Sequence, residues 1–289
     1  MRSLLFVPAD SEKKLAKGND CGADALILDL EDSVAAERKA GARQTALAYL
    51  REHGRRAQRP RLIVRVNALD TGLTDADLDV IVAGKPDAIL LPKAEGGPSV
   101  IHLDAKLTAR EALHGLPDGA IEILALATET ASALFLCGSY VGASKRLTAL
   151  TWGAEDLSAE LGSETNRDAD GRFTSPYMLA RNLSLAAAAA ARVQAIDTVY
   201  ADFRNMEGLR EESLEARRDG FTAKIAIHPA QVAVINDVFT PSPEEIAKAR
   251  AVIDAFAADP AAGVVAIDGV MYDRPHLRRA ERLLARVKM

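Results

Sequence analysis

The sequence predicts a closed parallel α/β barrel, (β/α)8, followed by a helical extension, and three observations support this fold class. The chain has 289 residues, which suits a barrel of about 250 residues with an appended piece. Short apolar runs recur along the chain, and an amphipathic stretch rich in Ala, Glu, Arg and Leu follows each of them. No Gly-x-Gly-x-x-Gly turn follows the first apolar run, which argues against the alternative, a doubly wound open sheet.

Eight apolar runs are predicted to be the barrel strands: Ser3–Val7, Ala25–Leu30, Arg61–Val66, Ala88–Leu91, Ile121–Leu126, Leu147–Trp152, Ala195–Tyr200 and Lys224–Ile227. Helices fit between them, for example Ala35–His53, Ser99–His114 and Pro176–Val193. Aromatic residues make up only 4% of the chain, so aliphatic side chains build the core, as buried parallel strands prefer. The polar segment Gly162–Phe173 is interpreted as a mobile loop, which either covers bound substrate or is a plain surface loop.

The predicted barrel domain covers residues 1–238, and an extension follows over residues 239–289. Ser242-Pro-Glu-Glu245 is a capping box with Pro at the first helical position, and it opens a helix to about Ala257. Asp259–Gly263 ends this helix, and the apolar stretch Val264–Ile267 leads to a last, basic helix. We expect a helical appendage that serves as a lid rather than a second full domain.

Composition excludes several classes of function. The net charge is −5, and no basic cluster interleaves with aromatic residues, so neither nucleic acid nor a membrane surface is an expected partner. The apolar run at the amino terminus is too short for a signal peptide or a membrane span. Cys21 and Cys137 are isolated and lack metal-type spacing, which indicates thiols in a reducing, cytoplasmic compartment.

Polar side chains follow nearly every predicted strand, at the end where barrel enzymes carry their chemistry. Glu129 and Asp156 follow the fifth and sixth strands. Either one alone could be a carboxylate that favours a helix N-terminus. Two on neighbouring strands repel each other unless a cation lies between them, and oxygen ligands without Cys or His suit Mg²⁺. We predict a magnesium site, with Glu155 as the alternative ligand to Asp156.

Three acidic residues, Asp29, Glu31 and Asp32, follow the second strand. Alternation along the strand points Asp29 and Glu31 into the barrel mouth, whereas Asp32 or Ser33 could cap the helix from Ala35. We expect Asp29, Glu31 and Asp32 to support the metal site and its cationic partner rather than to react.

Two basic residues lie at further strand ends. Arg65 has apolar neighbours, so its charge requires an anionic partner. That partner could be a substrate carboxylate, a developing enolate or, in a structural ion pair, Glu31. Lys93 could form a Schiff base, but nearby carboxylates should keep it protonated, which favours an electrostatic, supporting role.

Several segments recur in order in one known family: Arg2–Pro8, Asp24–Val34, Arg65–Asn67, Leu91–Lys93, Glu129–Ala131, Gly153–Gly162 and Ile227–Pro229. On these segments the chain resembles the citrate lyase β-subunit-like (malyl-CoA/citramalyl-CoA lyase) family of the HpcH/HpaI aldolase, phosphoenolpyruvate-binding barrel group. The resemblance runs from Arg2 to the final helix. Ala9 is a departure, because many relatives have Gly after the Val-Pro pair.

The resemblance implies a TIM barrel in which Glu129 and Asp156 bind Mg²⁺, with Glu129 also next to substrate. Arg65 would contact substrate as a catalytic group, and Gly153 and Ala154 would offer backbone amides to a substrate carboxylate.

The resemblance also implies a homo-oligomer, a trimer or hexamer, in which the extension reaches a neighbouring subunit. Asp273 is preferred over Asp268 as the catalytic acidic residue that the extension brings, although Asp273 also suits an N-cap of the last helix. Lys13 and Lys14 would meet coenzyme A phosphates or else form a solvated helix face.

The expected function is magnesium-dependent, reversible carbon–carbon cleavage of a 3-hydroxy-carboxyacyl-CoA thioester, of malyl-CoA or citramalyl-CoA type, to acetyl-CoA and an α-keto acid. Two alternatives stay open. One is the β-subunit of a multi-component citrate lyase that acts on a carrier-bound citryl thioester. The other is a lysine Schiff-base aldolase.

Overall fold

The computed structural model describes residues 1–287 and confirms the predicted fold class. The chain forms two compact units, Met1–Asp237 and Val238–Met289. In the first unit, eight parallel strands close into a barrel in chain order, and β1 pairs with β8. The strands are β1 (Ser3–Pro8), β2 (Ala25–Asp29), β3 (Arg61–Arg65), β4 (Ala88–Leu91), β5 (Glu122–Leu126), β6 (Leu147–Thr151), β7 (Gln194–Asp197) and β8 (Ala223–Ala226).

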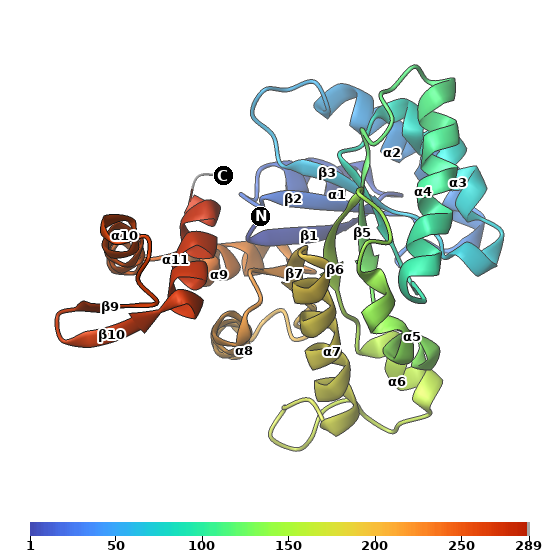
Figure 1. Ribbon diagram of the computed structural model, residues 1–289. Helices are drawn as coiled ribbons and strands as arrows, with labels where there is room; N and C mark the ends of the chain where they lie inside the picture. The colour runs from blue at the N-terminus through green and yellow to red at the C-terminus, as the bar shows by residue number, and fades with distance from the viewer. Residues whose placement is uncertain (288–289) are drawn as a thin grey trace. The chain divides into compact units, whose positions relative to one another are not determined.

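Helices connect the strands and lie outside them (Figure 1). The helices are α1 (Glu12–Asn19), α2 (Lys39–His53), α3 (Thr74–Ile81), α4 (Gly96–Leu113), α5 (Ala131–Leu136), α6 (Glu155–Leu161), α7 (Ser175–Ala191), α8 (Met206–Asp219) and α9 (Pro229–Phe239). Short 3-10 turns are η1 (Ala36–Arg38), η2 (Leu69–Thr71), η3 (Val82–Gly84) and η4 (Cys137–Tyr140). No helix within residues 1–287 is long and apolar enough to cross a bilayer.

Small aliphatic side chains fill the inside of the barrel. This core cluster includes Leu4, Ile27, Ile63, Leu90 and Leu124, all fully or almost fully buried. Because side chains alternate between the two faces of a strand, the residues two positions later point the same way at the strand's carboxyl end. Asp29 follows Ile27 and Arg65 follows Ile63 in this manner, so the apolar core gives way to charged groups at the barrel mouth.

Some predicted boundaries differ from the structure. The seventh strand ends at Asp197 rather than Tyr200. The predicted helix over Ala35–His53 begins as the separate turn η1, whose N-cap residue Ala35 has no side-chain cap bond. The alternative in which Asp32 or Ser33 caps this helix is not realised, because Ala35 is the N-cap residue of η1 and Arg38 is that of α2.

The second unit contains helices α10 (Pro243–Ala258) and α11 (Arg274–Val287) and a hairpin of β9 (Val264–Ile267) and β10 (Val270–Asp273). The predicted capping box at Ser242 is present, with both reciprocal bonds to Glu245. The strand β10 was not predicted. Its sequence signal is the pair Asp268–Gly269, which has φ of 50° and 76°, as a tight two-residue hairpin turn requires. The lid role of this extension and the boundary after residue 238 stay predictions.

Candidate active site

Arg65, the last residue of β3, contacts two carboxylates at the charged barrel mouth. Its Nε and Nη2 donate to the two carboxylate oxygens of Asp29 at 2.7 and 2.6 Å, and its Nη1 lies 2.9 Å from Glu31 Oε2. Its guanidinium also packs over the Phe6 ring at 4.6 Å. The expected ion pair with Glu31 is thus present, and Asp29 is a second partner.

These contacts hold both members of the Arg65–Asp29 pair in their charged forms. Burial alone would lower the pKa of Arg65, but the hydrogen bonds and charge of Asp29 outweigh it and raise that pKa. Burial would likewise raise the pKa of Asp29, but Arg65 and the Ser33 and Glu31 amides keep it below its ordinary value. Removing one partner of a buried ion pair destabilises the protein strongly, because the other charge is left buried without compensation. The Arg65–Asp29 pair is therefore a rigid support.

Lys93 connects the acidic segment after β2 with the carboxylates after β5 and β6. Its Nζ lies 2.5 Å from Glu31 Oε1 and 3.1 Å from Asp156 Oδ1, and Asp32 Oδ2 is 3.3 Å away. Its backbone N–H donates to Glu129 Oε2 at 2.7 Å. Burial lowers the pKa of Lys93, but Glu31 and then Glu129 and Asp156 raise it above its ordinary value, so the amine stays protonated.

Glu129 is a buried carboxylate just beyond β5. Burial, with added repulsion from Asp156 and Glu31, raises its pKa to about 8. A nearby divalent cation would offset both effects, since it stabilises the charged form. The donor set therefore fits a hard cation such as Mg²⁺, for which carboxylate oxygens are preferred ligands.

Gly153, between β6 and α6, leaves the space that the Glu129 carboxylate occupies. A Cβ built on Gly153 would lie 3.0 Å from both Glu129 Cγ and Oε1, which is tighter than ordinary contact. Ala154 is buried and forms the N-cap position of α6. The Gly153–Ala154 turn is thus packed directly on the proposed metal ligand.

The two alternative ligands on α6 have different partners. Asp156 is one-third exposed and faces Lys93, whereas Glu155 Oε1 accepts a 2.9 Å hydrogen bond from Asn166 Nδ2 in the following loop. Both lie in the first turn of α6. This geometry favours Asp156 as the ligand, and the assignment stays a prediction.

The remaining predicted site residues have no described contact with this cluster. Lys13 and Lys14 are exposed on α1. Asp273 ends β10 in the second unit, where its Oδ1 lies 2.5 Å from His276 Nδ1 and accepts from the His276 N–H at 3.4 Å. His276 also lowers the pKa of Asp273. The N-cap alternative for Asp273 is therefore realised, and Asp268 lies in the hairpin turn.

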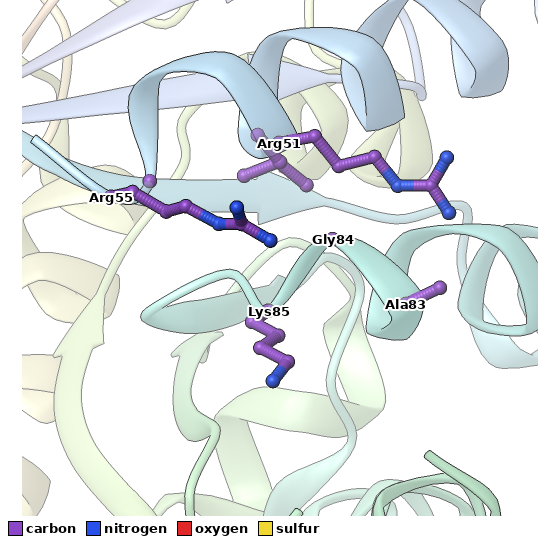
Figure 2. Close-up of a pocket in the computed structure, with 7 residues that line it drawn as sticks. Arg51, Arg55, Ala83, Gly84 and Lys85 are labelled. Carbon is purple, nitrogen blue, oxygen red and sulfur yellow. The ribbon is translucent and has the colours of Figure 1, made fainter.

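Residues 1–287 contain no group of three His, Cys, Asp or Glu side chains that forms a ready-made metal site, at the barrel mouth or elsewhere. One hollow of the first unit is lined in part by the basic residues Arg51, Arg55 and Lys85 (Figure 2). These residues precede β3 and β4, so this hollow lies at the amino end of the strands, opposite to the charged mouth.

Sequence reasoning missed a second buried charge cluster. Lys224 in β8 donates to Asp197 Oδ2 at 2.6 Å and to Glu212 Oε1 at 2.9 Å, and its side chain has no exposed surface. The signal in the sequence is a lysine within the apolar run Ala223–Ile227. A lysine there requires buried carboxylate partners.

A closed α/β barrel whose mouth carries Arg65 and Lys93 among carboxylates has the arrangement typical of a barrel enzyme, in which the chemistry lies at the carboxyl ends of the strands. Within that class, the chain belongs to the HpcH/HpaI aldolase/citrate lyase family, whose model matches residues 2–229. The resemblance seen in the sequence is confirmed.

Curated relatives span nearly the whole chain. A (3S)-malyl-CoA thioesterase of Cereibacter sphaeroides (strain KD131) is 38% identical over 99% of this chain and 94% of its own length. The citrate lyase subunit beta of Escherichia coli (strain K12) is 34% identical over 100% of this chain and 93% of its own length. The relatives therefore carry names from two different reactions.

A solved structure is similar along the whole chain. It is the protein CitE from Mycobacterium tuberculosis in complex with magnesium, acetoacetate and coenzyme A, with a TM-score of 0.78 and 34% sequence identity. The match covers 100% of this chain and 98% of that protein.

Proposed function

We propose that this protein is a magnesium-dependent carbon–carbon lyase that reversibly cleaves a 3-hydroxy-carboxyacyl-CoA thioester to acetyl-CoA and an α-keto acid. The observation that carries the proposal is the convergence of Glu129 and Asp156 on Lys93, beside the Arg65 pair. The magnesium and coenzyme A bound to the Mycobacterium tuberculosis relative support both the cofactor and the substrate class.

Glu129 and Asp156 would hold the metal, and Lys93 would balance the surrounding negative charge. Bound Mg²⁺ supplies Lewis acidity to the hydroxyl and carboxylate oxygens of the substrate. The Gly153 and Ala154 amides would orient a substrate carboxylate, since their turn packs against Glu129. Substrate would complete the site.

Arg65 would face the thioester oxygen as negative charge develops on it. An arginine has five N–H donors, and contacts with Asp29 and Glu31 occupy three of them. Two therefore remain for substrate, held in a fixed position by two buried carboxylates. A preorganised donor of this kind stabilises a developing oxyanion without reorganising.

The proton on the substrate hydroxyl requires a base, and Asp273 of a neighbouring subunit is the proposed one. Its carboxylate is partnered with His276 here and has a lowered pKa, which makes it a weaker proton acceptor. In the proposed oligomer, contact with the neighbouring site would replace this local partner.

The lysine Schiff-base alternative has little support. A Schiff base requires a neutral amine as the nucleophile, whereas the carboxylates around Lys93 raise its pKa. We expect cleavage to stop when a chelator is added, and borohydride to trap no adduct on Lys93. Cleavage that persists with chelator, together with a trapped adduct, would reverse this ranking.

A second candidate function is hydrolysis of malyl-CoA, because the Cereibacter sphaeroides relative is named a (3S)-malyl-CoA thioesterase. The products separate the two reactions. Cleavage of malyl-CoA yields acetyl-CoA and glyoxylate, whereas hydrolysis yields malate and a free CoA thiol. We expect purified protein with Mg²⁺ to release keto acid before any free thiol appears, and thiol release without keto acid would favour the thioesterase.

The citrate lyase β-subunit alternative is supported by the Escherichia coli relative. In this alternative the acyl group is attached to a carrier protein, whereas in the proposed function it is attached to free coenzyme A. Activity on free CoA esters by the purified chain alone would exclude a strict need for a carrier protein, and activity only on a carrier-bound citryl thioester would establish it.

A further inference from the structure

The loop between α6 and α7, expected to be mobile, is attached to its surroundings at several points. Arg167 Nη1 donates to Glu212 Oε2 of α8 at 2.8 Å, and the Arg167 guanidinium stacks over the Phe173 ring at 3.7 Å. Arg167 and Phe173 also form a backbone bridge, which closes the loop on itself. Asn166, the preceding residue, contacts Glu155. The mobility of this loop stays a prediction, and these contacts define the conformation described here.

Glu212 connects Arg167 to a row of buried side chains with alternating charge, Lys224 and then Asp197. Its other oxygen accepts from Lys224 at 2.9 Å, and Lys224 donates to Asp197 at 2.6 Å. Asp197 Oδ1 in turn accepts from the Trp152 indole N–H at 2.8 Å. Burial lowers the pKa of Lys224, but Asp197 and Glu212 outweigh it and raise that pKa, so Lys224 stays protonated.

A second path between the same two residues is aromatic. The Phe173 ring, on which the Arg167 guanidinium stacks, contacts the Trp152 ring edge-on, with centroids 4.9 Å apart and planes at 66°. Polar and aromatic contacts thus both begin at Arg167 and end at Trp152. Trp152 is fully buried and directly precedes Gly153, whose lack of a side chain makes room for Glu129.

The cluster has no role in the chemistry proposed above, and it lies on the outer side of the barrel wall. Ala223 and Ile225 belong to the interior core, so Lys224 between them points outward, toward α8. Burying several charges is costly and is often not the most stabilising choice. A positioning role explains why both paths end beside the Gly153 turn.

We propose that Arg167 is a positioning residue which, by holding Glu212 and Phe173 together, fixes Trp152 and with it the Gly153–Ala154 turn. The consequence for substrate binding rests on the proposed function, in which this turn binds a substrate carboxylate. The consequence for Trp152 itself does not.

The first experiment uses Trp152 as its own reporter, since the chain has a single tryptophan. We expect Arg167→Met to shift the tryptophan emission to longer wavelength and to raise its quenching by acrylamide several-fold. Arg172→Met is the matched control, because Arg172 lies in the same loop and its side chain is exposed. Emission and quenching of Arg167→Met that equal those of Arg172→Met would overturn the proposal.

Arg167→Lys serves as the second variant. It keeps a positive charge toward Glu212 but loses the flat guanidinium over Phe173, so we expect intermediate quenching. It also carries the test if Arg167→Met does not fold, which circular dichroism and the melting temperature will show. Quenching of Arg167→Lys identical to wild type in that case would count against the proposal.

The activity measurement addresses the turn. We expect Arg167→Met to raise KM for the acyl-CoA substrate by about tenfold, with a smaller change in kcat and partial rescue by Arg167→Lys. An unchanged KM alongside exposed Trp152 would overturn the link to the turn. A wild-type protein without any acyl-CoA activity would contradict the proposed function alone, because the fluorescence comparison still decides the positioning role.

Discussion

Lys93 is the residue around which the barrel mouth is arranged. Its φ is 49°, a left-handed conformation that costs about 1–2 kcal/mol for a residue with a side chain. This conformation lets its backbone N–H reach Glu129 while its side chain reaches Glu31 and Asp156. Backbone strain that a surrounding network maintains is typical of functional sites.

Glu129 allows a direct test of the metal site at the residue scale. We expect Glu129→Gln to reduce kcat/KM by about 10²–10³, because Gln has nearly the same shape but cannot balance a divalent cation. The fold should persist, since Glu129 is buried with a raised pKa and its charge gains nothing from folding in the metal-free protein. The assay is turnover with Mg²⁺, beside the rise in melting temperature that Mg²⁺ induces.

Glu155→Gln is the matched control for this variant. Glu155 lies next to Asp156 but bonds Asn166, so the variant should keep both turnover and the response to Mg²⁺. Loss of the Mg²⁺ response in Glu155→Gln but not in Glu129→Gln would contradict the proposed ligand set.

At the scale of elements, the Asp87 carboxylate in the turn before β4 holds two strands together. Asp87 accepts bonds from two Arg59 nitrogens at 2.5 and 2.9 Å and from the Leu62 N–H at 2.7 Å, so it joins the starts of β3 and β4. Burial raises its pKa, but Arg59 and the Leu62 amide outweigh this and lower it below the ordinary value.

A depressed pKa in the folded state predicts how stability depends on pH. The stabilisation by Asp87 is fully present above the unfolded pKa of about 3.9 and is lost as pH falls through the lower folded pKa. We expect Asp87→Asn to be less stable than wild type at pH 6 and this difference to shrink below about pH 4. Urea unfolding of both proteins from about pH 6 to below about pH 4 measures the difference in their free energy of unfolding. A difference that does not change with pH would contradict the stabilising role of the Asp87 carboxylate.

The capping box of α10 gives a second prediction for an element. Ser242 accepts from the Glu245 N–H at 3.2 Å, and Glu245 Oε2 accepts from the Ser242 N–H at 2.8 Å. Replacing Ser242 by Ala should cost about 1 kcal/mol of helix stability, visible as faster hydrogen exchange in the first turn of α10. Ser242→Asp should retain the cap, and equal exchange in Ala and Asp variants would argue against its contribution.

At the scale of the whole molecule, the proposed oligomer makes two different variants complementary. If Asp273 acts in a neighbouring subunit, Asp273→Asn and Glu129→Gln should each be strongly impaired alone. Co-expressed and purified together, they should regain part of the activity, because some sites then combine an intact Glu129 with an intact Asp273. Turnover of the mixed protein measures this, with Asp268→Asn in place of Asp273→Asn as the control that should stay active on its own.

The fold was largely predictable because its determinants are local. Apolar runs of strand length, alternating with amphipathic helices, predicted all eight strands, and the period of two along the second strand predicted that Asp29 points into the barrel mouth. The Ser242 capping box was also read correctly, since its partners are three residues apart. The missed strand β10 had a local signal too, in Asp268–Gly269.

What only the tertiary structure decided was which charged residues meet. Barrel closure brings the Lys93 amide to Glu129 and the Lys93 side chain to Asp156, and it seats Lys224 between Asp197 and Glu212. The sequence by itself determined that charges would gather at the strand ends, because alternation and strand order act over a few residues. Apart from the Arg65–Glu31 pair, which was one of three alternatives for Arg65, it could not determine the partners, since each distance between strands depends on the stagger and packing of the closed barrel.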